Sequence, residues 1–212
     1  MSTDTSKSAF IKTWVGGYSE GFEGYPKGAR DQIVATCLAP FYDKTHTALE
    51  IGCGRGFWVV NYLIPNFAHV ICLDVIPKPT ELAGLPITYI ELPDRTFDGV
   101  GVPDASIDFI WSFGLFCHLS GAACKEYLRS IYRMLKPTGR AVVMFGNWTR
   151  HPYLMHRPPL RDESCADSRE ENDDVIWYYC DHVLAQRWCE AAGFKFKDLI
   201  PDHRDTLAYI EK

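Results

Sequence analysis

The chain has 212 residues, of which 47% are hydrophobic, and this length and composition fit one globular domain with a sizeable core. Its formal net charge is -5 at pH 7 and it has no long basic run, which argues against nucleic acid as the main partner. It also has no stretch of about 20 apolar residues, so we expect no membrane-spanning helix and no membrane partner.

The eight cysteines are scattered through apparent strands and helices, without a Cys-x-x-Cys pair. The first residues lack the apolar segment of a secretory signal. We therefore expect a cytoplasmic protein whose cysteines are buried free thiols. The oligomeric state stays open.

Short apolar runs alternate with helical patterns along most of the chain. An aromatic and glycine-rich stretch, residues 8–26, precedes a predicted helix over 29–41. Five strands are then expected, at 47–51, 68–73, 87–92, 107–113 and 140–145. Helices are expected at 57–63, near Glu81, and from the N-cap Ser120 to Leu135.

The last third of the chain begins with a polar, proline-rich and then acidic segment, residues 146–175, which predicts an excursion over the surface. A final helix is expected from Asp181 to Gly193, followed by strands at 194–200 and 206–210.

This order of elements predicts an α/β fold, namely a doubly wound, Rossmann-like, mostly parallel seven-stranded sheet with helices on both faces. We divide the chain into an N-terminal aromatic and helical lid segment, residues 1–45, and a main domain, residues 46–212, with a single domain overall. In such a sheet, a ligand binds at the carboxyl ends of the strands.

The first predicted strand carries Glu50 and runs into a glycine-rich turn, Gly52-x-Gly54-x-Gly56. Glycines let the backbone bend sharply and let a ligand approach the main chain. The second predicted strand ends in Asp74, which follows Gly56 by 18 residues. An acid about 20 residues beyond such a turn meets the ribose hydroxyls of a bound nucleoside.

A dinucleotide fingerprint would instead require Gly-x-Gly-x-x-Gly. Here the third glycine comes one residue early, and Phe57 and Trp58 follow it. Glu50 would repel a pyrophosphate but would tolerate a cationic ligand or an amino group. A nicotinamide-dependent reductase is therefore disfavoured, and a tight strand–helix turn without a ligand is the structural alternative.

Glu50, the three glycines and Asp74, at this spacing, resemble the S-adenosylmethionine site of class I methyltransferases. Residues 103–112 look like the fourth-strand motif of that family. Residues 127–140 look like its segment leading into the fifth strand, with Thr138 where the family usually has a glycine. The resemblance covers residues 48–145 and the closing helix and strand pair. It implies the fold and the cofactor but not the methyl acceptor.

The resemblance also implies roles for individual residues around the turn. The backbone from Gly52 to Gly56, which includes Cys53 and Gly54, would cradle the methionine part of S-adenosylmethionine. Glu50 would orient the amino group of the cofactor through water.

Further along the chain, the resemblance implies that Asp74 holds the ribose hydroxyls and that Val75 lies under the adenine. Ser112, at the end of the fourth strand, would line the site near the sulfonium.

His118 follows the fourth strand and is the candidate general base, because histidine titrates near neutral pH and an oxygen acceptor must lose a proton. The alternative is that His118 caps or packs the following helix. We predict no metal: Asn147 is suitably placed as a ligand, but Ser112 and His118 do not complete a carboxylate set.

The segment after the fifth strand is locally basic and includes Arg150, His151 and Arg157. Arginine binds carboxylate and phosphate groups through paired hydrogen bonds, so these residues suggest an anionic acceptor. Tyr18 is the candidate to contact the methionine carboxylate or the acceptor. The alternative for the basic segment is a solvated loop, and the alternative for Tyr18 is packing among aromatic side chains.

We therefore expect an S-adenosylmethionine-dependent methyltransferase that acts on a small molecule, with O-methylation of a sugar-like or anionic metabolite favoured. The alternatives are an N- or protein methyltransferase and a non-catalytic partner subunit that keeps the fold.

Overall fold

The computed structural model describes residues 27–93, 98–150 and 180–212. The predictions for most of the lid segment, for Tyr18, and for His151 and Arg157 lie outside the described residues. So does most of the predicted surface excursion after the fifth strand.

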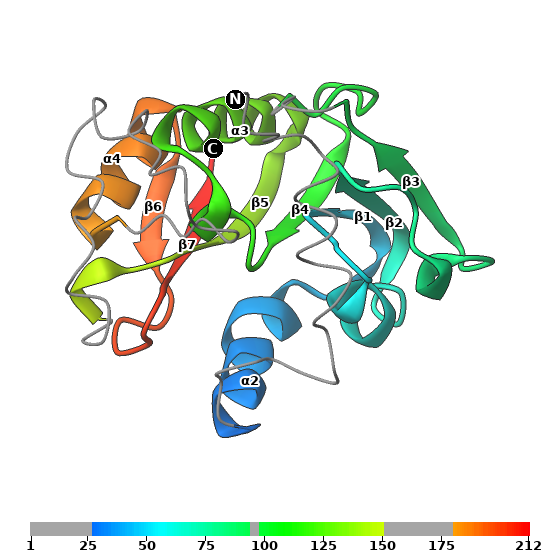
Figure 1. The fold of residues 1–212 in the computed structure, drawn as a ribbon, viewed down its shortest axis with the longest axis horizontal. Coiled ribbons are helices and arrows are strands. Elements are labelled where there is room, and N and C mark those ends of the chain that lie inside the picture. Colours follow the sequence, from blue (N-terminus) through cyan, green and yellow to red (C-terminus); the bar gives the residue numbers. More distant parts are fainter. Residues whose placement is uncertain (1–26, 94–97, 151–179) are drawn as a thin grey trace, which may run out of the picture.

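The described residues form one seven-stranded sheet with the strand order β3-β2-β1-β4-β5-β7-β6 (Figure 1). Strands β1 to β5 pair in parallel, and β7 is antiparallel to both β5 and β6. This confirms the predicted doubly wound, mostly parallel sheet. The strands are β1 Asp43–Ile51, β2 Phe67–Asp74, β3 Ile87–Glu91, β4 Ile107–Ser112, β5 Leu135–Phe145, β6 Lys195–Asp198 and β7 Thr206–Glu211.

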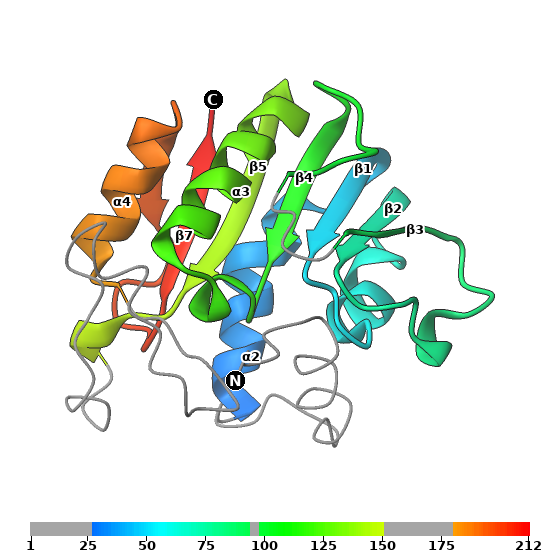
Figure 2. The same ribbon diagram turned by 45° about the horizontal axis from the view of Figure 1, so that its top comes forward.

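Helices cover both faces of the sheet, as predicted, with α3 on one side and α2 on the opposite side (Figures 1 and 2). Successive residues of a strand point to opposite faces, so Leu49 packs in the cluster beneath α3 and α4, whereas Ala48 packs with α2. The helical elements are α2 Lys27–Ile33, η1 Val34–Leu38, η2 Ala39–Phe41, η3 Val59–Leu63, η4 Thr80–Leu82, η5 Phe116–His118, α3 Gly121–Met134, η6 Trp148–Arg150 and α4 His182–Ala191.

The two long helices begin at the predicted caps. The Ser120 hydroxyl accepts a hydrogen bond from the Ala123 N–H at 3.3 Å, and the Asp181 carboxylate accepts one from the Leu184 N–H at 2.7 Å. These side chains satisfy N–H groups that have no partner inside the first helical turn. Gly193, with φ of 98°, follows α4 in the left-handed region.

Strand β5 begins five residues earlier than predicted, directly after α3. Leu135 pairs with Ile107 and Arg140 with Phe109, so the register shifts between the two pairs. The Lys136 ammonium binds the Asp108 carboxylate at 2.7 Å and holds the extra segment against β4. The proline and glycine here are typical of a loop, and only the pairing with β4 makes the segment part of the sheet.

Seven of the cysteines lie in the described residues, and all seven are buried and free, as predicted. Burial raises the pKa of several of these thiols, among them Cys37 to about 12. In the described part of the chain, no helix is long and apolar enough to cross a membrane.

Candidate functional site

The glycine turn links the end of β1 to the helix that contains η3. Gly52, Gly54 and Gly56 have φ angles of 76°, 50° and 86°, all in the left-handed region that glycine adopts most easily. A Cβ atom at Gly56 would collide with the Leu82 side chain, whereas one at Gly54 would meet no atom within 4 Å. Gly56 is therefore required for packing, and Gly54 leaves its backbone facing open space.

Asp74, the last residue of β2, binds this turn directly. Its Oδ2 accepts a hydrogen bond from the Gly54 N–H at 2.8 Å, and its Oδ1 accepts from Val75 at 2.7 Å and Ile76 at 3.2 Å. The side chain is largely buried, and burial raises the pKa of its carboxyl although these hydrogen bonds act in the opposite direction. Asp74 thus holds the turn at the carboxyl edge of the sheet.

Glu50 lies beneath the turn and is 1% exposed. It sits on β1 between Cys72 of β2 and Trp111 of β4. Burial, followed by the nearby Cys72 and Asp74, raises the pKa of its carboxyl well above the usual value, and a hydrogen bond from the Val59 N–H lowers it. Its Oε2 atom has no hydrogen-bond partner among the described residues.

Ser112 ends β4 at the same edge and donates a hydrogen bond to the Ile51 carbonyl at 3.0 Å. Cys53 is buried inside the glycine turn, and the pKa of its thiol is well raised by a hydrogen bond with Cys72 and by burial. Val75 is the first residue after β2, next to Asp74. The structure therefore brings together, at the carboxyl ends of β1, β2 and β4, the predicted cofactor residues Glu50, Gly52, Cys53, Gly54, Gly56, Asp74, Val75 and Ser112.

The residues around this turn fit a ligand with a nucleoside and a positively charged end. A buried carboxyl oxygen without a partner, on Glu50, suits an ammonium group. A strand-terminal acid, Asp74, suits ribose hydroxyls, and Gly54 leaves space next to its backbone.

His118 is the last residue of η5, which follows β4 at the carboxyl edge. Its side chain is half-buried, and its backbone N–H donates to the Leu115 carbonyl at 2.8 Å. Ser120, the cap of α3, stands two residues further on. At this position His118 fits the predicted role of general base, and it fits equally well the alternative role of packing against the start of α3.

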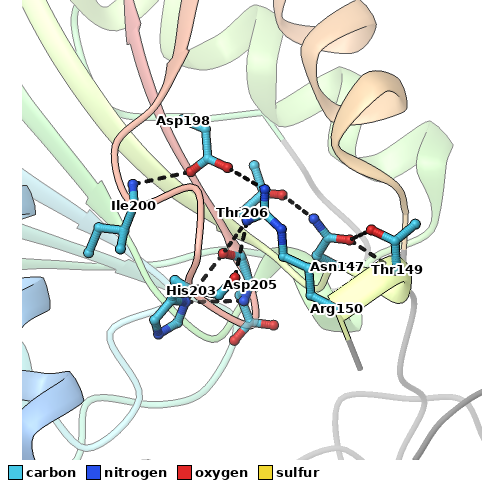
Figure 3. Close-up of polar contacts among 8 residues, drawn as sticks. All are labelled: Asn147, Thr149, Arg150, Asp198, Ile200, His203, Asp205 and Thr206. Carbon is cyan, nitrogen blue, oxygen red and sulfur yellow. Dashed lines mark hydrogen bonds and ion pairs between the residues drawn. The ribbon is translucent and has the colours of Figure 1, made fainter. Parts of the chain in front are cut away.

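Asn147 is fully buried at the end of β5 (Figure 3). Its Nδ2 donates to the Thr206 hydroxyl at 2.8 Å, and its Oδ1 accepts from the Thr149 N–H at 3.0 Å and the Thr149 hydroxyl at 2.8 Å. Asn147 thus links the segment that follows β5, through Thr149, to the start of β7, through Thr206.

Arg150 is bound within the protein rather than facing outward as a free cation (Figure 3). Its guanidinium forms an ion pair with Asp198 at 3.0 Å and donates to the carbonyls of His203 at 3.1 Å and Asp205 at 3.5 Å. The structure thus gives Arg150 the role of fixing the turn between β6 and β7. Its predicted contact with an acceptor stays a prediction.

The sequence did not predict that the turn from Ile200 to Asp205 lies at the same edge of the sheet as the carboxyl end of β5. His203 Nδ1 accepts a hydrogen bond from the Asp205 N–H at 3.1 Å, both side chains are buried, and burial lowers the pKa of His203. The polar residues between two predicted strands are typical of an ordinary turn. Only the antiparallel pairing of β7 with β5 brings this turn to the ligand edge.

Residues 49–143 match the family model described as a methyltransferase domain. An uncharacterised methyltransferase-like protein of the fission yeast Schizosaccharomyces pombe is 26% identical over 130 residues, which are 61% of this chain and 48% of that protein. The match thus spans about half the length of this curated relative.

Solved structures share the fold. A protein from Pyrococcus horikoshii superposes with a TM-score of 0.65 at 14% identity, covering 92% of this chain and 99% of that one. An S-adenosylmethionine-dependent methyltransferase from Mesorhizobium loti gives a TM-score of 0.61 at 15% identity, covering 90% and 98%. Residues 49–143 thus resemble a methyltransferase domain, and the described residues have the fold of solved S-adenosylmethionine-dependent methyltransferases; together with the sheet order and the glycine turn, these comparisons support S-adenosylmethionine as the cofactor.

Proposed function

We propose that this chain binds S-adenosylmethionine at the carboxyl ends of β1, β2 and β4 and methylates a small-molecule acceptor. The observation that carries the proposal is the arrangement of Glu50, the glycine turn and Asp74 at one edge of the sheet, with Asp74 bound to the turn at Gly54. Glu50 provides a buried carboxyl that suits a cationic group, and Gly54 provides open space beside its backbone that suits the close approach of a nucleoside ligand.

The cofactor supplies a methyl group on a positively charged sulfur. In our proposal, the backbone around Cys53 and Gly54 holds its methionine part, and Glu50 holds its ammonium group. Asp74 takes the ribose hydroxyls, Val75 lies next to the adenine, and Ser112 lines the site near the sulfur. These residues contribute mainly by aligning the two reactants, which can supply about 7–11 kcal/mol of the barrier reduction.

For the acceptor, we favour an oxygen nucleophile on a sugar-like or anionic metabolite. The net charge of -5 disfavours nucleic acid, which leaves small molecules and proteins as candidates. His118 would remove the proton of the acceptor hydroxyl, while His151, Arg157 and Tyr18 would contact the acceptor. Because Arg150 is already bound to Asp198, the anionic character of the acceptor depends on those other residues.

The proposal is tested by calorimetric titration of the purified protein with S-adenosylmethionine, S-adenosylhomocysteine and NADH. Micromolar binding of both adenosyl compounds, without binding of NADH, is the expected result. Absence of binding by either adenosyl compound would contradict the proposal and favour a scaffold role for the chain.

The acceptor is then sought with labelled S-adenosylmethionine and separate pools of sugar phosphates, carboxylic acids, amines and peptides. Methyl transfer to the first two pools is expected. Transfer to amines or peptides would instead identify an N- or protein methyltransferase, and cofactor binding without transfer to any pool would favour a partner subunit.

A further inference from the structure

Two buried polar atoms on neighbouring strands lack partners among the described residues: the indole Nε1 of Trp111 and the carboxyl Oε2 of Glu50. Trp111 is 0% exposed and Glu50 is 1% exposed. A buried donor or acceptor left without a partner costs about 1–3 kcal/mol, so such atoms are rare and call for an explanation. Here one atom is a donor and the other an acceptor.

The two side chains lie next to each other on the same face of the sheet. Glu50 of β1 and Trp111 of β4 are paired in the parallel register, and directly paired residues of adjacent strands point to the same side. Trp111, together with Ala48 of β1, belongs to the cluster beneath α2. Glu50 is two residues from Ala48 and therefore shares this face.

The indole ring of Trp111 is held in place by aromatic neighbours. Trp111 packs edge-on against Trp58, with ring centroids 5.0 Å apart, and is stacked on Phe113 at 5.7 Å. The terminal torsion of a glutamate is intrinsically broad, so the Glu50 carboxyl is the more adjustable of the two groups. A rotation of the Glu50 carboxyl is thus the simplest change that would pair these two atoms.

The other groups that face Glu50 favour its neutral form in the absence of a ligand. Burial raises the pKa of the Glu50 carboxyl, and Cys72 and Asp74 of β2 raise it further. The hydrogen bond from the Val59 N–H acts in the opposite direction. The approach of an ammonium group would favour the charged carboxylate, which accepts hydrogen bonds more strongly than the acid.

Building on the proposed function, we propose that Trp111 is a cofactor-positioning residue. Its indole N–H donates to the Glu50 carboxylate in the cofactor-bound protein and aims that carboxylate at the ammonium group of S-adenosylmethionine. Trp111 acts through Glu50 and does not itself contact the methyl group. Its contribution is confined to ligands that carry the amino-acid end.

The test compares two ligands that share the nucleoside but differ in that end: S-adenosylhomocysteine and 5′-methylthioadenosine, which lacks it. In calorimetric titrations, Trp111→Phe is expected to weaken S-adenosylhomocysteine binding about tenfold, the usual effect of losing a hydrogen bond to a charged group. The affinity for 5′-methylthioadenosine is expected to stay within about twofold. In a Glu50→Gln background, Trp111→Phe should add less than about twofold, because the two residues act as one unit.

The matched control is Trp188→Phe. Trp188 is also largely buried, at 8% exposed, but belongs to the cluster on the opposite face of the sheet. This variant should bind both ligands like the wild type. Equal losses for both ligands in Trp111→Phe would overturn the proposal and leave Trp111 as packing alone.

A second measurement needs no substitution at Trp111. In NMR spectra of wild-type protein with ¹⁵N-labelled tryptophan, the Trp111 indole proton should move downfield when S-adenosylhomocysteine is added, and this shift should be absent in Glu50→Gln. An unchanged resonance on saturation would overturn the proposal. If the wild type binds no S-adenosylhomocysteine, the proposed function itself fails; if it binds and Trp111→Phe binds equally well, only the role of Trp111 fails.

Discussion

The carboxylate of Asp74 and the backbone N–H of Gly54 are joined by a hydrogen bond of 2.8 Å that connects the end of β2 to the glycine turn. The two residues are 20 positions apart in the chain. The same carboxylate also accepts from Val75 and Ile76, so one side chain orders both strand ends. The ribose-binding acid of our proposal is therefore also part of the structure of the turn.

Replacing Asp74 by alanine should affect both stability and binding. Three backbone N–H groups lose their acceptor, which should lower the free energy of unfolding by about 1–3 kcal/mol and weaken S-adenosylhomocysteine binding by at least about tenfold. Asp43→Ala is the control, because Asp43 also accepts a backbone hydrogen bond, from Thr45, but is exposed and begins β1 at the far edge. Calorimetry and urea unfolding provide the two readouts, and unchanged affinity in Asp74→Ala would refute the ribose assignment.

Gly54→Ala and Gly84→Ala form a matched pair. Both glycines have positive φ, 50° and 73°, and a Cβ at either position would meet no atom within 4 Å. Each substitution should cost about 1–2 kcal/mol of backbone strain. Only Gly54→Ala places a methyl group where our proposal puts the cofactor, so it alone should lose S-adenosylhomocysteine binding in titrations. Similar affinities in both variants would show that the ligand lies elsewhere.

Glu50 should make the stability of the ligand-free protein depend on pH. The pKa of its carboxyl is well above the ordinary value of 4.5 in the folded protein, so the folded state keeps a proton that the unfolded chain releases. The free energy of unfolding should therefore fall as pH rises from 4.5 through the raised pKa.

Glu50→Gln removes this effect, because glutamine does not titrate. The variant should be more stable than the wild type at neutral pH and yet bind S-adenosylhomocysteine more weakly. Urea unfolding from pH 5 to pH 8 measures the difference, and parallel stability curves for the two proteins would contradict the prediction.

Arg150→Gln should destabilise the protein by about 1–3 kcal/mol, because it leaves the buried Asp198 carboxylate without its cation and frees the turn between β6 and β7. The Arg150 side chain is 22% exposed, which keeps the loss below that of a fully buried pair. Lys195→Gln is the control: its partner Glu211 lies 3.6 Å away, and the lysine is 77% exposed. That change should alter urea unfolding by less than about 0.5 kcal/mol. Equal effects would mean that the Arg150 network adds nothing to the fold.

His118→Ala should lower methyl transfer to the identified acceptor by about 10²–10⁴-fold and leave S-adenosylhomocysteine affinity unchanged, as expected for a general base. His46→Ala, which removes a half-exposed histidine of β1, should not change turnover. Turnover is measured with labelled S-adenosylmethionine over a range of pH. If His118→Ala turns over normally, His118 serves the start of α3 instead.

The sequence alone determined the order of the elements and the fold class, and it predicted the cofactor residues that the structure brings to one edge of the sheet. These features depend on local patterns: apolar runs mark the strands, glycines mark a turn that needs positive φ, and Ser120 and Asp181 mark the starts of helices because they bind their own backbone. Parallel strands then place Glu50, Gly54 and Asp74 at one edge, since all carboxyl ends meet there.

Only the tertiary structure decided the contacts between segments that are distant in the chain. Arg150 looks like a free cation in the sequence, but it binds Asp198, 48 residues away. The extension of β5 to Leu135 depends on pairing with β4, and the pairing of Glu50 with Trp111 depends on strand register. No local pattern encodes such pairings, because they follow from the packing of the whole sheet.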